Sequence, residues 1–325
     1  MDNSALIQHS RSATFRLMAL CVLAVVCATV FMTYDVHGQW DFALPLRAGK
    51  LATLTLVGYA IAVATVLFQT ATCNRILTPA IMGFDALYLL IQTACVQLLG
   101  SKGLLALPQH LLFTGQVAVM ILLCGLLYRV LFARGMANLF QLVLIGVILG
   151  ELFRGLSSLM LRLMNPNEFN FLQDRFFSSF NNPDHGLLLM SFIAVCLASL
   201  LGLRNLARID VLSLGRDMAT NLGLDHRREV SVILVTVAVL VAVSTALVGP
   251  VTFFGLLVAN LAYAAVGSYR HALLLPAAVC IAIICLVGGQ MVLEHALGFN
   301  SNLRVVVDFL GGITFIYILI KGNRS

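Results

Sequence analysis

The sequence predicts an all-α, polytopic membrane protein with about ten transmembrane helices, and three observations carry this prediction. Apolar residues make up 60% of the chain and charged residues only 10%, which excludes an ordinary water-soluble fold. Long apolar runs recur along the chain, each close to the length that a helix needs to cross a bilayer. Within these runs the apolar residues are continuous and do not alternate, which excludes lipid-facing barrel strands. The runs are 17–33, 51–72, 79–99, 111–133, 139–161, 186–203, 230–248, 251–267, 272–293 and 305–320.

The positions of the basic residues predict the orientation. If the N-terminus is cytoplasmic, an even number of crossings returns the C-terminus to the cytoplasm, and most of the 20 lysine and arginine residues then lie on that side. The net charge of +6 is therefore a signal of topology, and no basic run indicates nucleic-acid binding. The eight cysteines lie almost entirely in apolar runs without a CxxC motif, so we expect neither a zinc site nor a disulfide framework.

The first two runs are preceded by basic residues. The first run follows Arg11 and Arg16, as a signal peptide would, but no small-residue cleavage site follows it, and we expect a retained anchor. Arg47 and Lys50 open the second run. These two side chains either extend to the lipid headgroups or contact an acidic partner outside the membrane.

Two connections contain helix signals of their own. At the start of the third run, Pro79 suits a first helical turn, Thr78 is a possible N-cap, and Gly83 allows close packing of helices. Residues 164–180 are too polar to cross a membrane and too aromatic for a free loop. This segment is predicted to be a helix that lies at the outer membrane surface.

The fifth run contains two charges, Glu151 and Arg154, spaced to lie on one side of a helix. At about 16 Å into the membrane, neither charge can face lipid without a large free-energy cost, so both must face protein or water. One interpretation is a structural ion pair inside the bundle. The other is a polar lining of a substrate path, in which Arg154 attracts an anion.

Residues 207–229 form a long polar interruption in an otherwise apolar chain, and they predict a loop on the cytoplasmic face. Met218, Ala219 and Leu222 have the spacing of one side of a short helix, with Gly215 before it and Gly223 after it as a hinge and a C-terminal cap. The segment is either a solvated connector or a helix that docks into a groove of a soluble partner.

The remaining polar residues do not form a motif for catalysis, metal binding or nucleotide binding. Glu294, His295, Arg304 and Asp308 flank the outer connection between the last two runs, where they are expected to be ordinary interfacial groups. There is no phosphate-binding loop of the GxxxxGK[ST] type, so the chain is not expected to bind ATP itself. A nucleophile elbow, an HExxH motif and paired carboxylates at mid-membrane are also missing, which argues against an enzyme.

Five segments, in the same order along the chain, resemble the permeases of ATP-binding-cassette (ABC) importers for cobalamin and iron siderophores. The pair Ala259-Asn260, in place of the family's Pro-His, and the replaced NPLA motif in 74–83 indicate a divergent branch, and 46–50 lacks the proline of its motif. Segment 76–87, ILTPAIMGFDAL, is most similar to permeases of catecholate siderophores. The five segments are LRAGK at 46–50 (family L-R-x-P-R), 74–83 (NPLA, then PxxxG), LSLGRDMATNLGL at 212–224 (LsLGeeaArsLG), GPVTFFGLLVAN at 249–260 (GxIxFIGLVxPH) and HALLLP at 271–276 (HRxLLP).

The resemblance implies a single BtuC-like permease domain over 1–325, of the type II importer kind, with a cytoplasmic coupling loop at 207–229. It implies two ATPase subunits that carry ATP and magnesium, a periplasmic or surface-tethered binding protein, and a second permease, identical or homologous, in the bacterial inner membrane. Arg47, Lys50 and Arg304 would meet the binding protein. On their charge and position in the fifth run, rather than on the resemblance, Glu151 and Arg154 are the candidates to line the path of a ferric siderophore. The coupling residues would be Leu212, Leu214, Gly215, Arg216, Asp217, Met218, Ala219, Leu222 and Gly223.

On this reading the chain is a transport subunit that binds no cofactor of its own and moves the siderophore by alternating access. Its partners would be proteins, substrate and membrane lipids. The alternative function is a secondary transporter driven by an ion gradient. Such a transporter needs ion-binding or protonatable groups at mid-membrane, and Glu151 alone is weak support for such a site.

Overall fold

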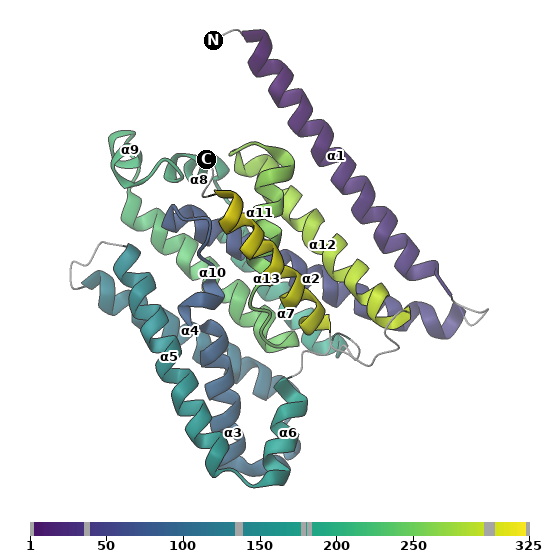
Figure 1. Cartoon of the computed structure of the whole chain (residues 1–325). Helices are drawn as coiled ribbons and strands as arrows, with labels where there is room; N and C mark the ends of the chain where they lie inside the picture. Colours follow the sequence, from purple (N-terminus) through teal and green to yellow (C-terminus); the bar gives the residue numbers. More distant parts are fainter. Residues whose placement is uncertain are drawn as a thin grey trace.

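A computed structural model describes residues 3–35, 40–133, 139–176, 180, 184–295 and 303–322, and over these residues the chain forms helices without any strand (Figure 1). The all-α prediction is therefore confirmed. The helices are α1 (Asn3–Thr33), α2 (Trp40–Thr72), the short 3-10 helix η1 (Pro79–Met82), α3 (Phe84–Ala106), α4 (Gln109–Ala133), α5 (Leu139–Leu163), α6 (Pro166–Phe176), α7 (His185–Gly202), α8 (Leu206–Leu212), α9 (Arg216–Asn221), α10 (His226–Val248), α11 (Phe254–Val266), α12 (His271–His295) and α13 (Leu303–Gly322).

Helices α2, α10 and α12 form the centre of the bundle. Leu67 and Phe68 of α2, Leu234 and Leu240 of α10, and Leu274 of α12 are among the largest side chains that are fully buried. The helices around them, such as α7 with its exposed Leu and Phe side chains, present apolar surface outward. Outward-facing leucine is favourable in hydrocarbon and unfavourable in water, so the pattern of burial itself indicates a protein surrounded by lipid.

Each of the ten predicted runs coincides with a helix. Eight helices in the described part of the chain are long and apolar enough to cross a membrane. Of the other two, α11 has 13 residues, about 20 Å of helix, and begins after an irregular stretch at 249–253. The last, α13, has 20 residues, of which several side chains lie outside the described part.

The third run differs from the prediction at its start. Pro79 opens the short helix η1, and Gly83 ends it with a φ of 90°, so α3 begins only at Phe84. Thr78 occupies the predicted N-cap position, with extended backbone angles, although its side chain makes no capping hydrogen bond. Close packing at Gly83 is confirmed, because a Cβ atom there would lie 2.7 Å from the Cα atom of Gly150 on α5.

The helix predicted within 164–180 is present as α6. Glu168 accepts hydrogen bonds from the backbone nitrogen and the hydroxyl of Ser101, at 2.7 and 3.0 Å. Ser101 follows Gly100, where α3 departs from helical geometry with a φ of 69°. The carboxylate therefore satisfies a backbone group that the break in α3 leaves free.

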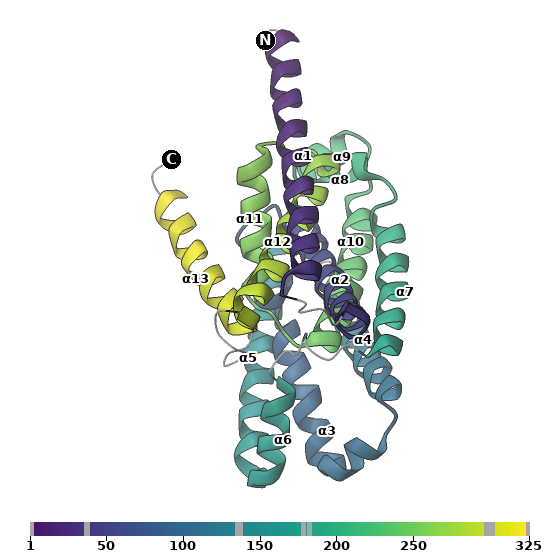
Figure 2. The same cartoon turned by 90° about the vertical axis from the view of Figure 1, so that its right-hand side faces the viewer.

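The start of α1 and the end of α13 both point toward the end of the bundle that carries α8 and α9 (Figures 1 and 2). An even number of crossings produces this arrangement. The opposite end carries the end of α1, the start of α2 and the end of α12. The two ends of the bundle are called the α8–α9 end and the opposite end below.

Candidate functional site

The polar segment 207–229 folds into two short helices, α8 and α9, which are separated by a turn at Gly215. Gly215 has a φ of 91°, a value that favours glycine, and it begins α9. Gly223 has a φ of 81°, with the amide of Leu224 bonded to the carbonyl of Ala219 and its own amide bonded to that of Thr220. This is the Schellman pattern of a helix end. The predicted short helix between two glycines is thus present.

One side of this segment carries three large apolar side chains that no other part of the described chain covers. Leu214, Met218 and Leu222 are between 59% and 65% exposed. Met218 and Leu222, four residues apart on α9 and its C-cap, have the spacing of one helix face, and Leu214 lies just before the turn at Gly215 that begins α9. Because they belong to a polar segment, their exposure cannot be explained by contact with hydrocarbon. We call these three residues the apolar stripe.

The composition of this stripe corrects the sequence-based prediction. Ala219 was expected to be part of the face with Met218 and Leu222, but its side chain is fully buried, so it lies at the edge of that face where α9 meets the rest of the chain. Leu212, at the end of α8, is also buried. These two residues attach the segment to the bundle, whereas Arg216 and Asp217 lie at the exposed start of α9.

Helix α8 is connected to the centre of the bundle through His271, a residue that the sequence analysis did not single out by itself. The Nδ1 atom of His271 lies 2.6 Å from the Oδ1 atom of Asp210 on α8, and its Nε2 atom lies 2.7 Å from the hydroxyl of Thr70 on α2. The backbone nitrogen of His271 also donates to Asp210, at 2.8 Å. The imidazole is buried. We call this chain of contacts the Asp210–His271–Thr70 link.

A second polar group holds the same end of the bundle together. The guanidinium of Arg75 lies over the rings of Tyr263 and Tyr269, 4.5 and 5.0 Å from their centroids. The backbone carbonyl of Arg75 accepts a hydrogen bond from Gln69 at 2.6 Å and one from Asn260 at 3.4 Å. The turn after α2, the helix α11 and the turn between α11 and α12 are therefore joined at this end.

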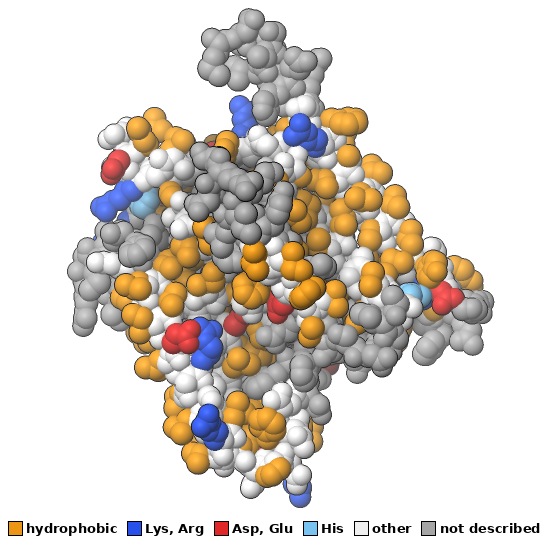
Figure 3. All heavy atoms as spheres, viewed as in Figure 1, with side chains coloured by type: hydrophobic (Ala, Val, Ile, Leu, Met, Phe, Trp, Pro, Cys, Tyr) orange, Lys and Arg blue, Asp and Glu red, His pale blue; other side chains and the backbone are white. Residues whose placement is uncertain are grey.

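The pair on the fifth run forms as predicted, and it faces outward. Arg154 Nη2 lies 2.6 Å from Glu151 Oε1, and the two side chains are 44% and 67% exposed. Figure 3 shows charged side chains among apolar ones on this face of the molecule. Asp85 of α3, which lies within electrostatic reach of Arg154, is buried and accepts a hydrogen bond from Thr252 at 2.8 Å. A fully internal ion pair, one of the two interpretations, does not fit this chain alone.

The three residues expected to meet a binding protein lie toward the opposite end of the bundle. Arg47 donates to the backbone carbonyls of Phe31 and Tyr34, which ties the end of α1 to α2. Lys50 pairs with Glu294 of α12 at 2.9 Å, and both side chains are at most 10% exposed. The ammonium of Lys50 is thus used inside the chain and is not presented to a partner. The side chain of Arg304 lies outside the described residues.

Within the described residues, no group of three or more His, Cys, Asp or Glu side chains could hold a metal ion. Three polar residues had no predicted role in the sequence: Asp85, Asp210 and Thr70. Each forms a hydrogen bond with a residue far away along the chain. His271 is the first residue of the HALLLP segment, Asp85 belongs to segment 76–87 and Asp210 to segment 207–229, but the sequence did not indicate their contacts.

Comparison with known proteins shows which family the sequence resembles. The sequence matches the FecCD transport family over residues 13–321. It is 47% identical to the petrobactin import system permease protein YclO of Bacillus subtilis, covering 95% of this chain and 98% of the relative. It is 33% identical to the petrobactin import system permease protein FatC of Bacillus anthracis, covering 98% and 95%.

A solved structure has the same fold. It is described as an inward-facing conformation of a putative metal-chelate type ABC transporter, and it superimposes with a TM-score of 0.82 at 22% identity, covering 95% of this chain and all of the other. The sequence match extends over nearly the whole chain, and the bundle has the shape of a permease. The chain therefore belongs to the FecCD transport family.

Proposed function

We propose that this chain is a permease subunit of an ABC importer that carries a ferric siderophore, of the catecholate type, across the cytoplasmic membrane. The observation that carries the proposal is the apolar stripe of Leu214, Met218 and Leu222, exposed on a polar segment. Such a stripe fits the helix-in-groove mode of binding to a soluble subunit. The names of the two Bacillus relatives, both petrobactin import permeases, support the substrate class.

In this proposal the α8–α9 end faces the cytoplasm, together with both termini. Two ATPase subunits bind ATP and magnesium there, and a substrate-binding protein delivers the siderophore at the opposite end. The permease works as a pair with a second copy or a homologous subunit. The chain needs no cofactor, because iron stays with its chelator and hydrolysis takes place on the partner.

The exposed pair of Glu151 and Arg154 supports the pairing of two permeases. Charged side chains on a helix at membrane depth are unfavourable against lipid, so another protein surface or a water-filled path must cover them. A second permease placed over this face would enclose the pair, and a path between the two subunits would then be lined by Arg154. A ferric tris-catecholate is anionic, and the guanidinium would lower the free energy of its entry.

Substitution of Arg154 tests this part of the proposal. Arg154→Gln removes the positive charge and keeps a polar side chain of similar length, so we expect uptake of the ferric siderophore to fall several-fold at equal protein level. Arg162→Gln, in the last turn of the same helix, is the matched control and should transport normally. Unchanged uptake in the Arg154 variant would make the pair a structural feature only.

The transport mechanism is tested with the permease, its ATPase and its binding protein in proteoliposomes. We expect ferric siderophore to accumulate only when ATP is supplied on the ATPase side, and to be insensitive to dissipation of the membrane potential. Accumulation driven by a sodium or proton gradient without ATP would instead establish a secondary transporter.

A further inference from the structure

A cavity of about 830 Å³ opens on the surface between α7, α8 and α10, at the α8–α9 end. Its floor is formed where α7 meets α10 at Gly202, at which a Cβ atom would lie 2.5 Å from the side chain of Thr236. The cavity is open on one side and is lined by polar groups at one end and aliphatic groups along the rest. It is separate from the apolar stripe, the Asp210–His271–Thr70 link and the pair of Glu151 and Arg154.

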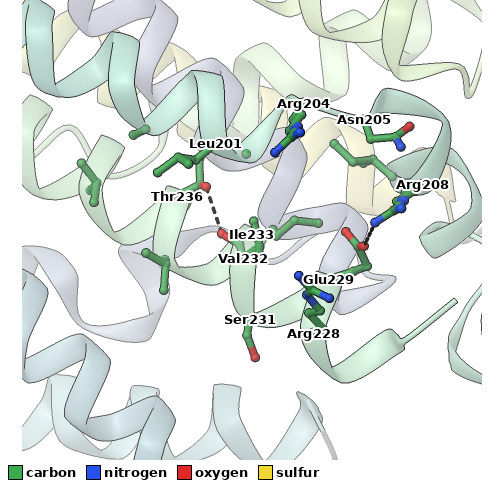
Figure 4. A pocket seen from close by; sticks show the side chains of 15 residues that line it. Leu201, Arg204, Asn205, Arg208, Arg228, Glu229, Ser231, Val232, Ile233 and Thr236 are labelled. Atoms are coloured by element: carbon green, nitrogen blue, oxygen red, sulfur yellow. Dashed lines mark hydrogen bonds and ion pairs between the residues drawn. The ribbon is translucent and has the colours of Figure 1, made fainter.

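The polar end of the cavity carries an excess of positive charge. Arg204, Arg208 and Arg228 line it, with Glu229 as the one acidic residue among the lining groups (Figure 4). Arg208 pairs with Glu229 at 2.8 Å. The guanidinium groups of Arg204 and Arg228 have no hydrogen-bond or ion-pair partner in the described parts of the chain, so two positive charges remain uncompensated at the mouth of the cavity.

The other lining residues are aliphatic and extend into the membrane region. Val232, Val235 and Val239 follow one side of α10, and the last of them lies 11 residues beyond Arg228, about 16 Å along the helix axis. That length matches one leaflet, half of a hydrocarbon core of roughly 30 Å. Leu201 of α7 and Val235 of α10 are more than half exposed, so the described chain does not cover this wall, and at membrane depth the wall would be open to hydrocarbon.

We propose that this cavity binds an anionic phospholipid of the cytoplasmic leaflet, with its phosphate between Arg204 and Arg228 and an acyl chain along the aliphatic wall of α10. A basic pocket between membrane helices on the cytoplasmic side has the chemistry that anionic headgroups require. A free anion would use the arginines but not the wall. A zwitterionic lipid would use the wall but would bring a second charge that the arginines repel.

The site also places a lipid beside the coupling machinery. Arg208 and Ile209 line the cavity and directly precede Asp210, the residue through which α8 is linked to His271. A bound headgroup would hold α8 from the side opposite to that link.

The test measures which lipids remain on the intact complex of permease and ATPase. The complex is purified in micelles that contain equal amounts of phosphatidylglycerol and phosphatidylcholine, and the retained lipids are quantified by native mass spectrometry. We expect the unmodified complex to retain phosphatidylglycerol preferentially. The double variant Arg204→Gln/Arg228→Gln should lower that preference on the order of tenfold, because each arginine near an anionic headgroup contributes to binding.

Three controls make the result decisive. Arg270→Gln removes an exposed arginine at the same end of the bundle, outside the cavity, and should keep the preference. Val235→Trp fills the aliphatic slot without changing the charge and should also reduce retention. Glycerol phosphate, a soluble headgroup, should not displace the lipid.

Four results would overturn the proposal. These are equal retention of both lipids by the unmodified complex, a preference in the double variant that is unchanged or is lost equally in the Arg270 variant, full retention in the Val235 variant, and displacement of the lipid by glycerol phosphate.

Discussion

Replacing Met218 with glutamate is expected to release the ATPase from the permease and to abolish ATP-driven uptake. Met218 is the middle residue of the apolar stripe and is 61% exposed. In a groove of the ATPase its side chain would be buried, and a carboxylate there would be buried without a partner. If Met218 is one of the few hot-spot residues of the interface, its loss costs about 2 kcal/mol or more, so binding should weaken by a factor of about 30 or more. Co-purification of the ATPase with the permease measures the effect.

The matched control is Thr220→Glu, which adds the same charge to the same short helix. Thr220 is exposed and lies two residues beyond Met218, about 200° away around the helix axis, so it points away from the stripe. This variant should bind the ATPase and transport substrate. If Met218→Glu retained the ATPase and full uptake while the bundle stayed folded, the apolar stripe would not be the docking surface.

Loss of the imidazole of His271 is expected to uncouple ATP hydrolysis from transport. His271→Ala breaks the Asp210–His271–Thr70 link and leaves the hydroxyl of Thr70 and the carboxylate of Asp210 without that partner. The buried hydroxyl of Thr70 keeps its bond to the carbonyl of Val66, and Asp210 is 36% exposed and keeps its bond from the backbone nitrogen of residue 271. The cost should therefore lie at the low end of the about 1–3 kcal/mol that a buried polar group without a partner costs. The thermal stability should fall, and α8 should no longer transmit its displacement to α2 and α12. The ATPase should still bind, because the apolar stripe is untouched.

The conservative variant separates coupling from stability. In His271→Asn the amide nitrogen can take the position of Nδ1 and donate to Asp210, whereas the contact of Nε2 with Thr70 is lost. Substrate transported per ATP hydrolysed should therefore be near normal if the contact with Asp210 transmits the movement, and Asp210→Ala should lower this ratio as His271→Ala does. A ratio that stays constant across the three variants, with only the melting temperature changed, would reduce the link to a structural contact.

Most of the fold could be predicted from the sequence because membrane-spanning helices are determined locally. A run such as 230–248 is apolar over the thickness of the bilayer, and no other backbone structure satisfies its hydrogen bonds in lipid. The predicted helix boundaries were wrong where charged residues belong to a helix but lie outside its apolar run. Helix α2 begins at Trp40, well before the apolar run at 51, because polar residues such as Arg47 and Lys50 find partners on α1 and α12.

The candidate sites were only partly predictable because they depend on contacts between distant segments. The short helix between Gly215 and Gly223 is a local feature and was predicted correctly. Which of its side chains are buried could not be predicted, because the burial of Ala219 depends on how α9 packs against the rest of the chain. Lys50 looked free in the sequence, and its partner Glu294 is 244 positions away along the chain. Contacts of this kind leave no periodic pattern in the sequence.

The contact of Gly83 with Gly150 limits how this permease can change shape. With no side chain on either residue, the turn before α3 lies directly against the backbone of α5, and even a methyl group would not fit between them. Such a contact resists sliding, so η1, α3 and α5 should travel together as one rigid block during a transport cycle. The hinge that opens the permease to one side and then the other must therefore lie at the seams between this block and the central helices.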